Sequence, residues 1–197
     1  MPNLKLSGKH ILLLLLYSPG ETPNYNEPII GRTRIMKMMF LFDKKVKKEI
    51  LKDSNIELIS FPEFFAWNYG PFSKDVFNDL EFFINNGFIE GNPLQVERSE
   101  IELSEYENWM EDYVFNGEDE LLLNIEAQEC FQLTENGKKF VAEKIYEKLS
   151  ENQRNIIIIF KKSINKATLN AILRYVYLDY PDYTRKSKIK GRFQKLY

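Results

Sequence analysis

The chain has 197 residues, of which 44% are hydrophobic and 28% charged, so it can bury a sizeable core and remain soluble. Its longest apolar run, residues 11–17, is too short to cross a bilayer, and no signal-peptide cleavage site follows it. A single cysteine excludes an internal disulfide, and a single histidine argues against a multi-histidine zinc site. We therefore expect a cytoplasmic protein that holds no metal and no cofactor.

The net charge of −2 conceals a segregation of charge along the chain. Residues 1–52 carry ten basic and four acidic side chains, whereas residues 53–129 carry two basic and nineteen acidic ones. Residues 130–197 return to fifteen basic and six acidic side chains. Two explanations are open: unlike segments attract each other within one fold, or the protein has two faces of opposite sign.

The first predicted helix covers residues 9–17, with Ser7 at its N-cap and Pro19-Gly20 after its end. A second helix is predicted for residues 32–51, because apolar side chains recur there at helical spacing. The following stretch, residues 56–69, is rich in Phe and Trp and is broken by Pro62. We expect it to be partly extended.

A third helix is predicted for residues 74–86, capped by Ser73 and ended by Gly87. Its apolar stripe consists of Val76, Phe77, Leu80, Phe83 and Ile84. Residues 88–90 then favour a short strand, and residues 129–133 favour a returning strand. Between these strands lies an acidic insertion, residues 91–128, whose aromatic residues around Trp109 predict an amphipathic helix.

Three more helices are predicted toward the C-terminus. Thr134 caps the fourth, residues 135–149, and Ser150 with Gln153 forms a capping box for the fifth. The β-branched run 156–159 leaves a strand open within the fifth segment, although its charged flanks favour a helix. The sixth helix covers residues 166–178, and a basic tail follows from 185 to 195. We divide the chain into residues 1–150 and a C-terminal helical extension, residues 151–197.

The order of three helices, a strand, a returning strand and a helix is that of a winged-helix domain. In residues 131–140, FQLTENGKKF, alternate residues of a strand close a core before Thr134 turns the chain into a helix. We therefore predict a mainly α (α+β) fold, with a winged-helix-like core, an acidic helical insertion in the wing and C-terminal helices.

Two segments carry a family resemblance: residues 34–41, RIMKMMFL, and residues 67–73, WNYGPFS. Together they resemble the YwgA-like proteins and the related SocA-like (Panacea) antitoxin domain, in which a basic helix precedes an aromatic-Gly-Pro-aromatic-Ser turn. The resemblance covers most of residues 9–90 and 130–185 and leaves the acidic insertion unexplained. It implies a small regulatory fold and, on the antitoxin side, neutralisation of a partner toxin or delivery of a client by direct protein contact.

The predicted third helix fits poorly into a DNA groove in the standard winged-helix pose. Phosphate contacts supply most of the affinity for DNA, and this helix offers only Lys74 for them. We therefore predict a non-catalytic regulator, antitoxin- or adaptor-like, whose protein partner is basic. The predicted protein-binding residues combine an aromatic turn with the acids of the third helix: Trp67, Tyr69, Phe72, Asp75, Asp79 and Glu81.

DNA binding remains the alternative function, through the second helix and the basic tail. Its predicted contacts are the basic side chains of those segments: Arg32, Arg34, Lys37, Arg185, Lys186, Lys188, Lys190 and Arg192. Aromatic residues interleave the tail, which suits nucleic acid, although a solvated terminus would have the same composition.

No set of residues predicts an enzyme. His10 is expected at a helix start as a capping or surface residue, and Cys130 in a strand as a core residue. Gly31 and Gly70 are isolated, so the sequence lacks a glycine-rich phosphate loop. The carboxylates of the insertion show no catalytic spacing and are typical of a solvated face.

Overall fold

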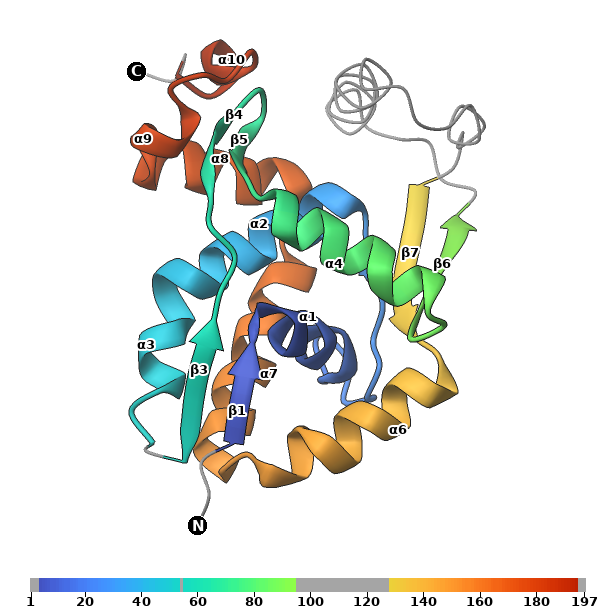
Figure 1. The fold of residues 1–197 in the computed structure, drawn as a ribbon. Coiled ribbons are helices and arrows are strands. Elements are labelled where there is room, and N and C mark those ends of the chain that lie inside the picture. Colours follow the sequence, from blue (N-terminus) through green and yellow to red (C-terminus); the bar gives the residue numbers. More distant parts are fainter. Residues whose placement is uncertain (1–3, 54, 95–127, 195–197) are drawn as a thin grey trace.

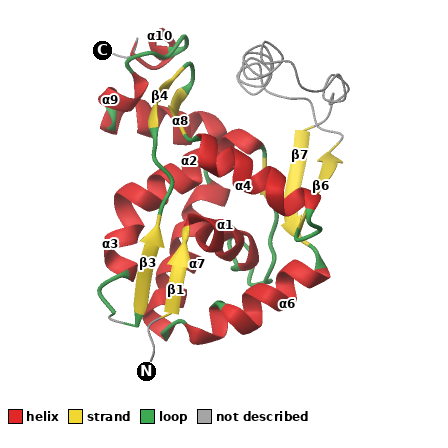
Figure 2. Ribbon diagram, in the orientation of Figure 1, coloured by secondary structure: helices red, strands yellow, loops and turns green. Residues whose placement is uncertain are grey.

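The computed structural model describes residues 4–53, 55–94 and 128–194. It is α-rich, with three small sheets set among the helices (Figures 1 and 2). In the first part of the chain, β1 (Leu4–Ser7) leads into α1 (Gly8–Tyr17), and β2 (Ile29–Ile30) leads into α2 (Arg32–Leu41). A π-helical turn (Phe42–Val46) joins α2 to α3 (Lys47–Ile50), so the predicted second helix is one continuous helical run with a local bulge.

The middle of the chain contains β3 (Ile56–Ser60), the hairpin strands β4 (Phe65–Trp67) and β5 (Gly70–Phe72), α4 (Lys74–Asn85) and β6 (Ile89–Leu94). The chain continues with β7 (Gln128–Leu133), α6 (Glu135–Lys144), a 3-10 turn (Tyr146–Lys148) and α7 (Glu151–Lys166). It ends with α8 (Leu169–Asp179), α9 (Pro181–Thr184) and α10 (Lys190–Gln194).

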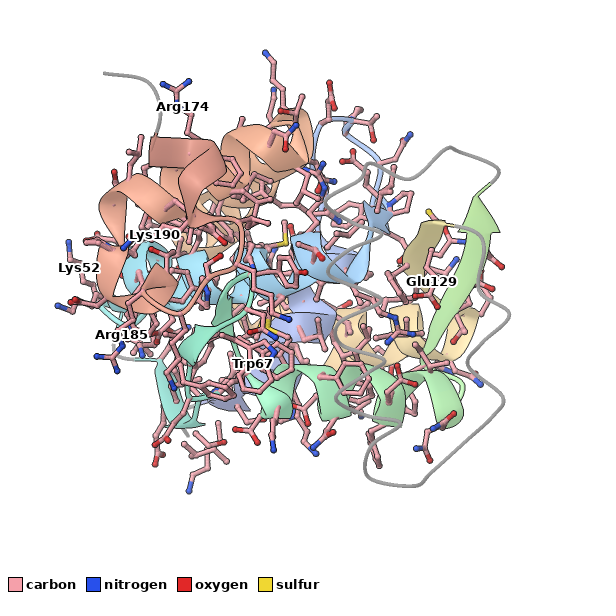
Figure 3. All side chains as sticks on the ribbon, turned by 90° about the horizontal axis from the view of Figure 1, so that it is seen from above. Lys52, Trp67, Glu129, Arg174, Arg185 and Lys190 are labelled. Atoms are coloured by element: carbon pink, nitrogen blue, oxygen red, sulfur yellow. The ribbon has the colours of Figure 1, made fainter. Side chains whose placement is uncertain are left out.

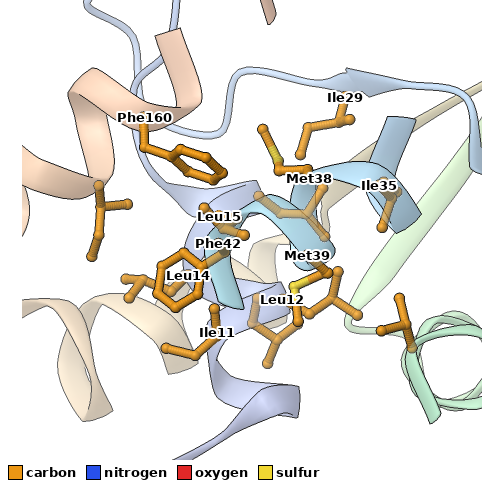
Figure 4. Close-up of a cluster of buried hydrophobic side chains, with 14 of the residues drawn as sticks. Ile11, Leu12, Leu14, Leu15, Ile29, Ile35, Met38, Met39, Phe42 and Phe160 are labelled. Carbon is orange, nitrogen blue, oxygen red and sulfur yellow. The ribbon is translucent and has the colours of Figure 1, made fainter. Parts of the chain in front are cut away.

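Helix α1 is buried on all sides, which explains its unbroken apolar sequence. All six side chains from Ile11 to Leu16 are at most 1% exposed. They pack against Ile35, Met38 and Met39 of α2, Phe42 of the π-helical turn and Phe160 of α7 (Figure 4). The hydrophobic core is thus assembled around α1, at the centre of Figure 1.

The core crosses the expected boundary at residue 150. Ile157, Phe160 and Ile164 of α7 belong to the same buried cluster as α1. A second, smaller cluster also combines residues from both sides of that boundary: Tyr69, Leu169, Leu173, Tyr177 and Ile189. The C-terminal helices therefore complete the packing of the preceding elements.

The largest sheet has three antiparallel strands in the order β2-β7-β6. Ile29 pairs with Phe131, and Ile89 pairs with Leu133, so strand β7 lies between the other two. Strands β1 and β3 form a parallel pair, with Leu4 opposite Ile56. The predictions missed the strands β1 and β2, because each is short and depends on a partner distant in sequence.

Most predicted helices are confirmed together with their capping residues. The hydroxyls of Ser73, Thr134 and Ser150 accept hydrogen bonds from the first turns of α4, α6 and α7. Residues 156–159 are helical, so the alternative of a strand in this segment is wrong.

Two boundaries and the nature of the tail were predicted wrongly. The fourth helix ends at Lys144 and gives way to a 3-10 turn. The sixth begins at Leu169, because Thr168 caps it. Part of the predicted tail is folded, since Ile189 is only 7% exposed in the second cluster.

The predicted insertion falls largely outside the described residues. Of residues 91–128, the structure describes 91–94, which belong to β6, and 128, which begins β7. The amphipathic helix expected around Trp109 lies in the part that the structure does not describe. Within the described residues, no helix has the length and apolar character needed to span a membrane.

Candidate functional site

Helix α4 presents an outer face with an aromatic residue at its middle. Its inner face buries Val76, Phe77, Leu80 and Phe83 in the core. Phe82, one residue away from that stripe, is 49% exposed, and the Lys9 ammonium lies 4.9 Å from its ring centroid. The other exposed residues of α4 are polar and carry little net charge: Lys74, Asp75, Asn78 and Asn85.

Two of the acids predicted to bind a partner are instead held within the fold. Asp79 is 8% exposed, and its carboxylate lies 3.3 Å from the Lys9 ammonium. Burial raises the pKa of Asp79, and the hydrogen bond with Lys9 opposes that rise. Glu81 is half-buried and accepts a hydrogen bond from Arg32. The prediction that Asp79 lies on the outer face of α4 was therefore wrong.

Arg32 forms the centre of an ion cluster between α2, α4 and β7. Its Nε donates to Glu129 Oε2 at 2.5 Å and its Nη2 to Glu129 Oε1 at 3.1 Å, while Nη1 donates to Glu81. The guanidinium also lies 5.6 Å from the Phe77 ring and 5.4 Å from the Phe131 ring. Burial alone would lower the pKa of Arg32, but the two carboxylates raise it overall.

The basic side chains of α2 do not form the cationic surface that the DNA alternative requires. Arg34 Nη1 donates to the carbonyls of Ile164 and Ala167, each at 2.7 Å. Lys37 is 3% exposed and donates to the Pro71 carbonyl at 3.4 Å. Together with the engaged Arg32, these side chains stabilise contacts between α2 and neighbouring elements. This part of the predicted nucleic-acid surface was wrong.

The hairpin β4–β5 places three aromatic rings together, which we name the aromatic patch: Phe65, Trp67 and Phe72. The ring centroid of Phe65 lies 5.7 Å from the centroids of both Trp67 and Phe72, and the centroids of Trp67 and Phe72 are 6.0 Å apart. Phe65 is 38% exposed, whereas the paired residues Ala66 and Pro71, whose side chains point to the opposite face of the hairpin, are buried. Sequence analysis named Trp67 and Phe72 for this surface but left out Phe65.

Tyr69 was predicted with the aromatic patch but points into the second hydrophobic cluster, where it is 7% exposed. The turn that directs it depends on Gly70, whose φ is +92°. A Cβ atom at Gly70 would lie 3.4 Å from Tyr177 Cε2, so this position combines an unusual backbone conformation with close packing.

The basic C-terminal segment lies beside this hairpin. The Lys188 amide donates to the Asn68 carbonyl at 2.9 Å, and the Ser187 hydroxyl donates to the same oxygen at 3.0 Å. Arg185, Lys186 and Lys188 are exposed, whereas Lys190 is half-buried. Trp67, Arg185 and Lys190 lie on one side of the molecule and Glu129 on the other (Figure 3). Arg192 belongs to α10, and the structure does not describe its side chain.

The chemically reactive candidates occupy structural positions. His10 Nδ1 accepts a hydrogen bond from the Ser7 amide at 3.0 Å, and burial lowers the pKa of His10. Cys130 is half-buried in β7, and burial raises the pKa of its thiol. Among the described residues, no group of three or more His, Cys, Asp or Glu side chains is placed to hold a metal ion.

The exposure of Phe82 and the burial of Lys161 were not predicted from the sequence. Phe82 breaks the apolar stripe of α4, so a helical-wheel argument could have placed it outside the core. Lys161 is fully buried and donates to the carbonyls of Leu16, Ser18 and Glu27 at 2.9, 2.6 and 2.6 Å. Helical spacing separates the two lysines, because Lys161 lies on the buried stripe of α7 with Ile157 and Ile164, whereas Lys162 is exposed.

No protein-family model, no curated protein and no solved structure matches this chain. The resemblance to the YwgA-like and SocA-like families therefore stays a prediction. What the chain does has to be argued from its surfaces.

Proposed function

We propose that this protein is a non-catalytic regulator that binds another protein through the outer face of α4. The observation that carries the proposal is the exposure of Phe82 at the middle of that face. Exposed aromatic side chains with polar surroundings are typical anchors of protein interfaces. The exposed residues of α4 around Phe82 are polar, and the Lys9 ammonium lies over its ring, which fits the polar rim of such an interface.

The partner that fits this face offers an apolar socket for Phe82 and basic side chains around it. Asp75 is exposed in the first turn of α4, and Glu90, in the following strand β6, is exposed and accepts a hydrogen bond from Gln132. Lys74 and Lys9 are the nearby cations, and Lys9 is paired with Asp79. A basic partner would meet the exposed carboxylates of Asp75 and Glu90, and such charge complementarity improves association rates and discrimination.

We infer a winged-helix-like core from the order of its elements. Helices α1, α2 and α4, strands β6 and β7 and helix α6 follow one another in the sequence expected for such a domain. Strand β2, at the beginning of the core, pairs with β7. In this arrangement α4 is the helix that would enter a DNA groove.

The charge of α4 argues for a protein in place of duplex DNA. Lys74 is balanced by the neighbouring Asp75, so the exposed face gains little from releasing counterions around phosphates. The cations of α2 cannot compensate, because Arg32, Arg34 and Lys37 bind groups within the fold. An antitoxin- or adaptor-like role remains our proposal for the class of regulator.

A capture experiment with matched variants tests this function. Tagged full-length protein would be incubated with nuclease-treated native extract, alongside Phe82→Ala and Asp75→Lys. Ile159→Ala is the control, because Ile159 is 68% exposed and belongs to a different helix, α7. We expect wild type and the control to retain a protein that the α4 variants lose by about tenfold or more. Equal capture by all four proteins, or loss after nuclease treatment, contradicts the proposal.

A further inference from the structure

The aromatic patch and the C-terminal cations are far apart in the sequence but adjacent in the structure. Ser187 and Lys188 both donate to the carbonyl of Asn68, in the turn between β4 and β5. The Tyr177 and Ser187 hydroxyls also share a hydrogen bond, which ties α8 to the same point. Helix α9 packs against both hairpin strands (Figure 1). The basic segment is therefore fixed beside the rings.

The aromatic patch contributes little to the packing of the hydrophobic core. Phe72 packs against the main hydrophobic cluster, but Phe65 and Trp67 are not among the described side chains that pack against either cluster. Phe65, Trp67 and Phe72 contact one another edge to face or at a tilt. The patch thus offers aromatic surface to a ligand, and the hairpin fixes it in advance.

Two of the neighbouring cations, Arg185 and Lys186, form no ion pair among the described residues. Residues 181–190 carry four basic side chains and one carboxylate, that of Asp182. Exposed acids flank the hairpin in the chain, because Glu63 precedes β4 and Asp75 follows β5. The segment from Arg185 to Lys190 itself carries four basic side chains and no carboxylate, so it is cationic beside the rings.

We propose that the aromatic patch and residues 185–190 bind single-stranded nucleic acid. Its bases would stack on Trp67 and Phe65, and its phosphates would lie against Arg185 and Lys186. A duplex keeps its bases stacked on each other, so it could use the cations but not the rings. An acidic peptide would likewise leave the rings without planar groups to stack on. This activity is independent of the protein contact through α4.

A binding titration separates these ligands. The fluorescence anisotropy of a labelled oligothymidylate of about 20 nucleotides is followed at about 50 mM and about 200 mM salt. We expect saturable binding by wild type, weakened about tenfold by Trp67→Ala. The double variant Arg185→Glu/Lys186→Glu should bind more weakly and reduce the slope of log Kd against log salt by about 1.4, or about 0.7 for each phosphate contact.

Two controls match these variants. Lys162→Glu/Lys166→Glu makes the same charge change at exposed positions of α7, and Phe82→Ala removes an exposed ring from α4. Both should bind like wild type. If Phe82→Ala loses its protein partner but keeps the oligonucleotide, the two surfaces are shown to be separate.

A second measurement leaves the aromatic patch and residues 185–190 unaltered. The chain has two tryptophans, so Trp109→Phe leaves Trp67 as the single indole emitter. Stacking of a base should quench its fluorescence as the oligonucleotide is added. The proposal is overturned if wild type shows no saturable binding at the lower salt, or if Trp67 is not quenched. It is also overturned if polyglutamate competes as well as the oligonucleotide, or if a duplex binds equally well.

Discussion

The ion cluster around Arg32 gives the sharpest stability prediction. Replacing Arg32 by Met keeps much of the side-chain volume between the Phe77 and Phe131 rings but removes the charge. The side chains of Arg32, Glu81 and Glu129 are 20%, 32% and 17% exposed, so the two carboxylates cannot be fully solvated when the cation is lost. Breaking a buried ion pair on one side costs about 3–5 kcal/mol, and the partial exposure here indicates the lower end, about 3 kcal/mol.

Thermal and urea unfolding measure this effect. For a chain of this size, about 3 kcal/mol corresponds to a fall in Tm of about 6–12 °C. The double variant Arg32→Met/Glu129→Gln removes the charge of the carboxylate that accepts two hydrogen bonds from Arg32, and should recover about 1–2 kcal/mol of the loss. A fall in Tm of less than about 2 °C, or strict additivity of the two substitutions, would show that the cluster is solvated and does not hold α4 against β7.

Three further predictions concern single sites. His10→Gln keeps an acceptor for the Ser7 amide but does not titrate. Since burial lowers the pKa of His10, the free energy of unfolding of wild type should fall relative to that of the variant as the pH drops below about 6.5. A constant difference between their urea unfolding curves at every pH would contradict this. Lys161→Met removes the donor to three backbone carbonyls and should lower the free energy of unfolding by about 3 kcal/mol. Lys162→Met should lower it little, so similar urea midpoints for the two variants would refute the role of Lys161. Gly70→Ala and Gly87→Ala should each cost about 1–2 kcal/mol, because both glycines have positive φ and an added Cβ would make no contact shorter than 3.4 Å at either position. Urea midpoints equal to that of wild type would show that the backbone conformation at these glycines is not strained for alanine.

Local signals were enough to predict most of the helices. A Ser or Thr hydroxyl at an N-cap acts within one turn, so Ser73, Thr134 and Ser150 predict where their helices begin without any tertiary information. Periodicity likewise identified the buried faces of α2 and α4. The parallel pair β1–β3 could not be predicted in the same way, because residues 4–7 acquire a partner only when residues 56–60 are brought beside them.

The candidate site was harder to predict than the fold, because the fate of a charged side chain depends on its neighbours in space. Asp79 and Lys37 have ordinary helical contexts, yet both are buried, the first against Lys9 and the second near Pro71. The aromatic turn was found from its composition, but its contact with residues 187 and 188 required the structure. Sequence could name the kinds of residue involved and could not assign them to one surface.

The segregation of charge along the chain therefore has two different physical meanings. The N-terminal cations Lys5, Lys9 and Arg32 pair with carboxylates of the acidic middle, so their attraction contributes to the fold. The cations Arg185 and Lys186 are exposed and meet no such carboxylate among the described residues, so their potential acts outward. Attraction within the fold and a separate cationic surface were opposing explanations of one pattern, and each describes a different part of the chain. Because salt screens exposed charges, binding through Arg185 and Lys186 should weaken as the salt concentration rises.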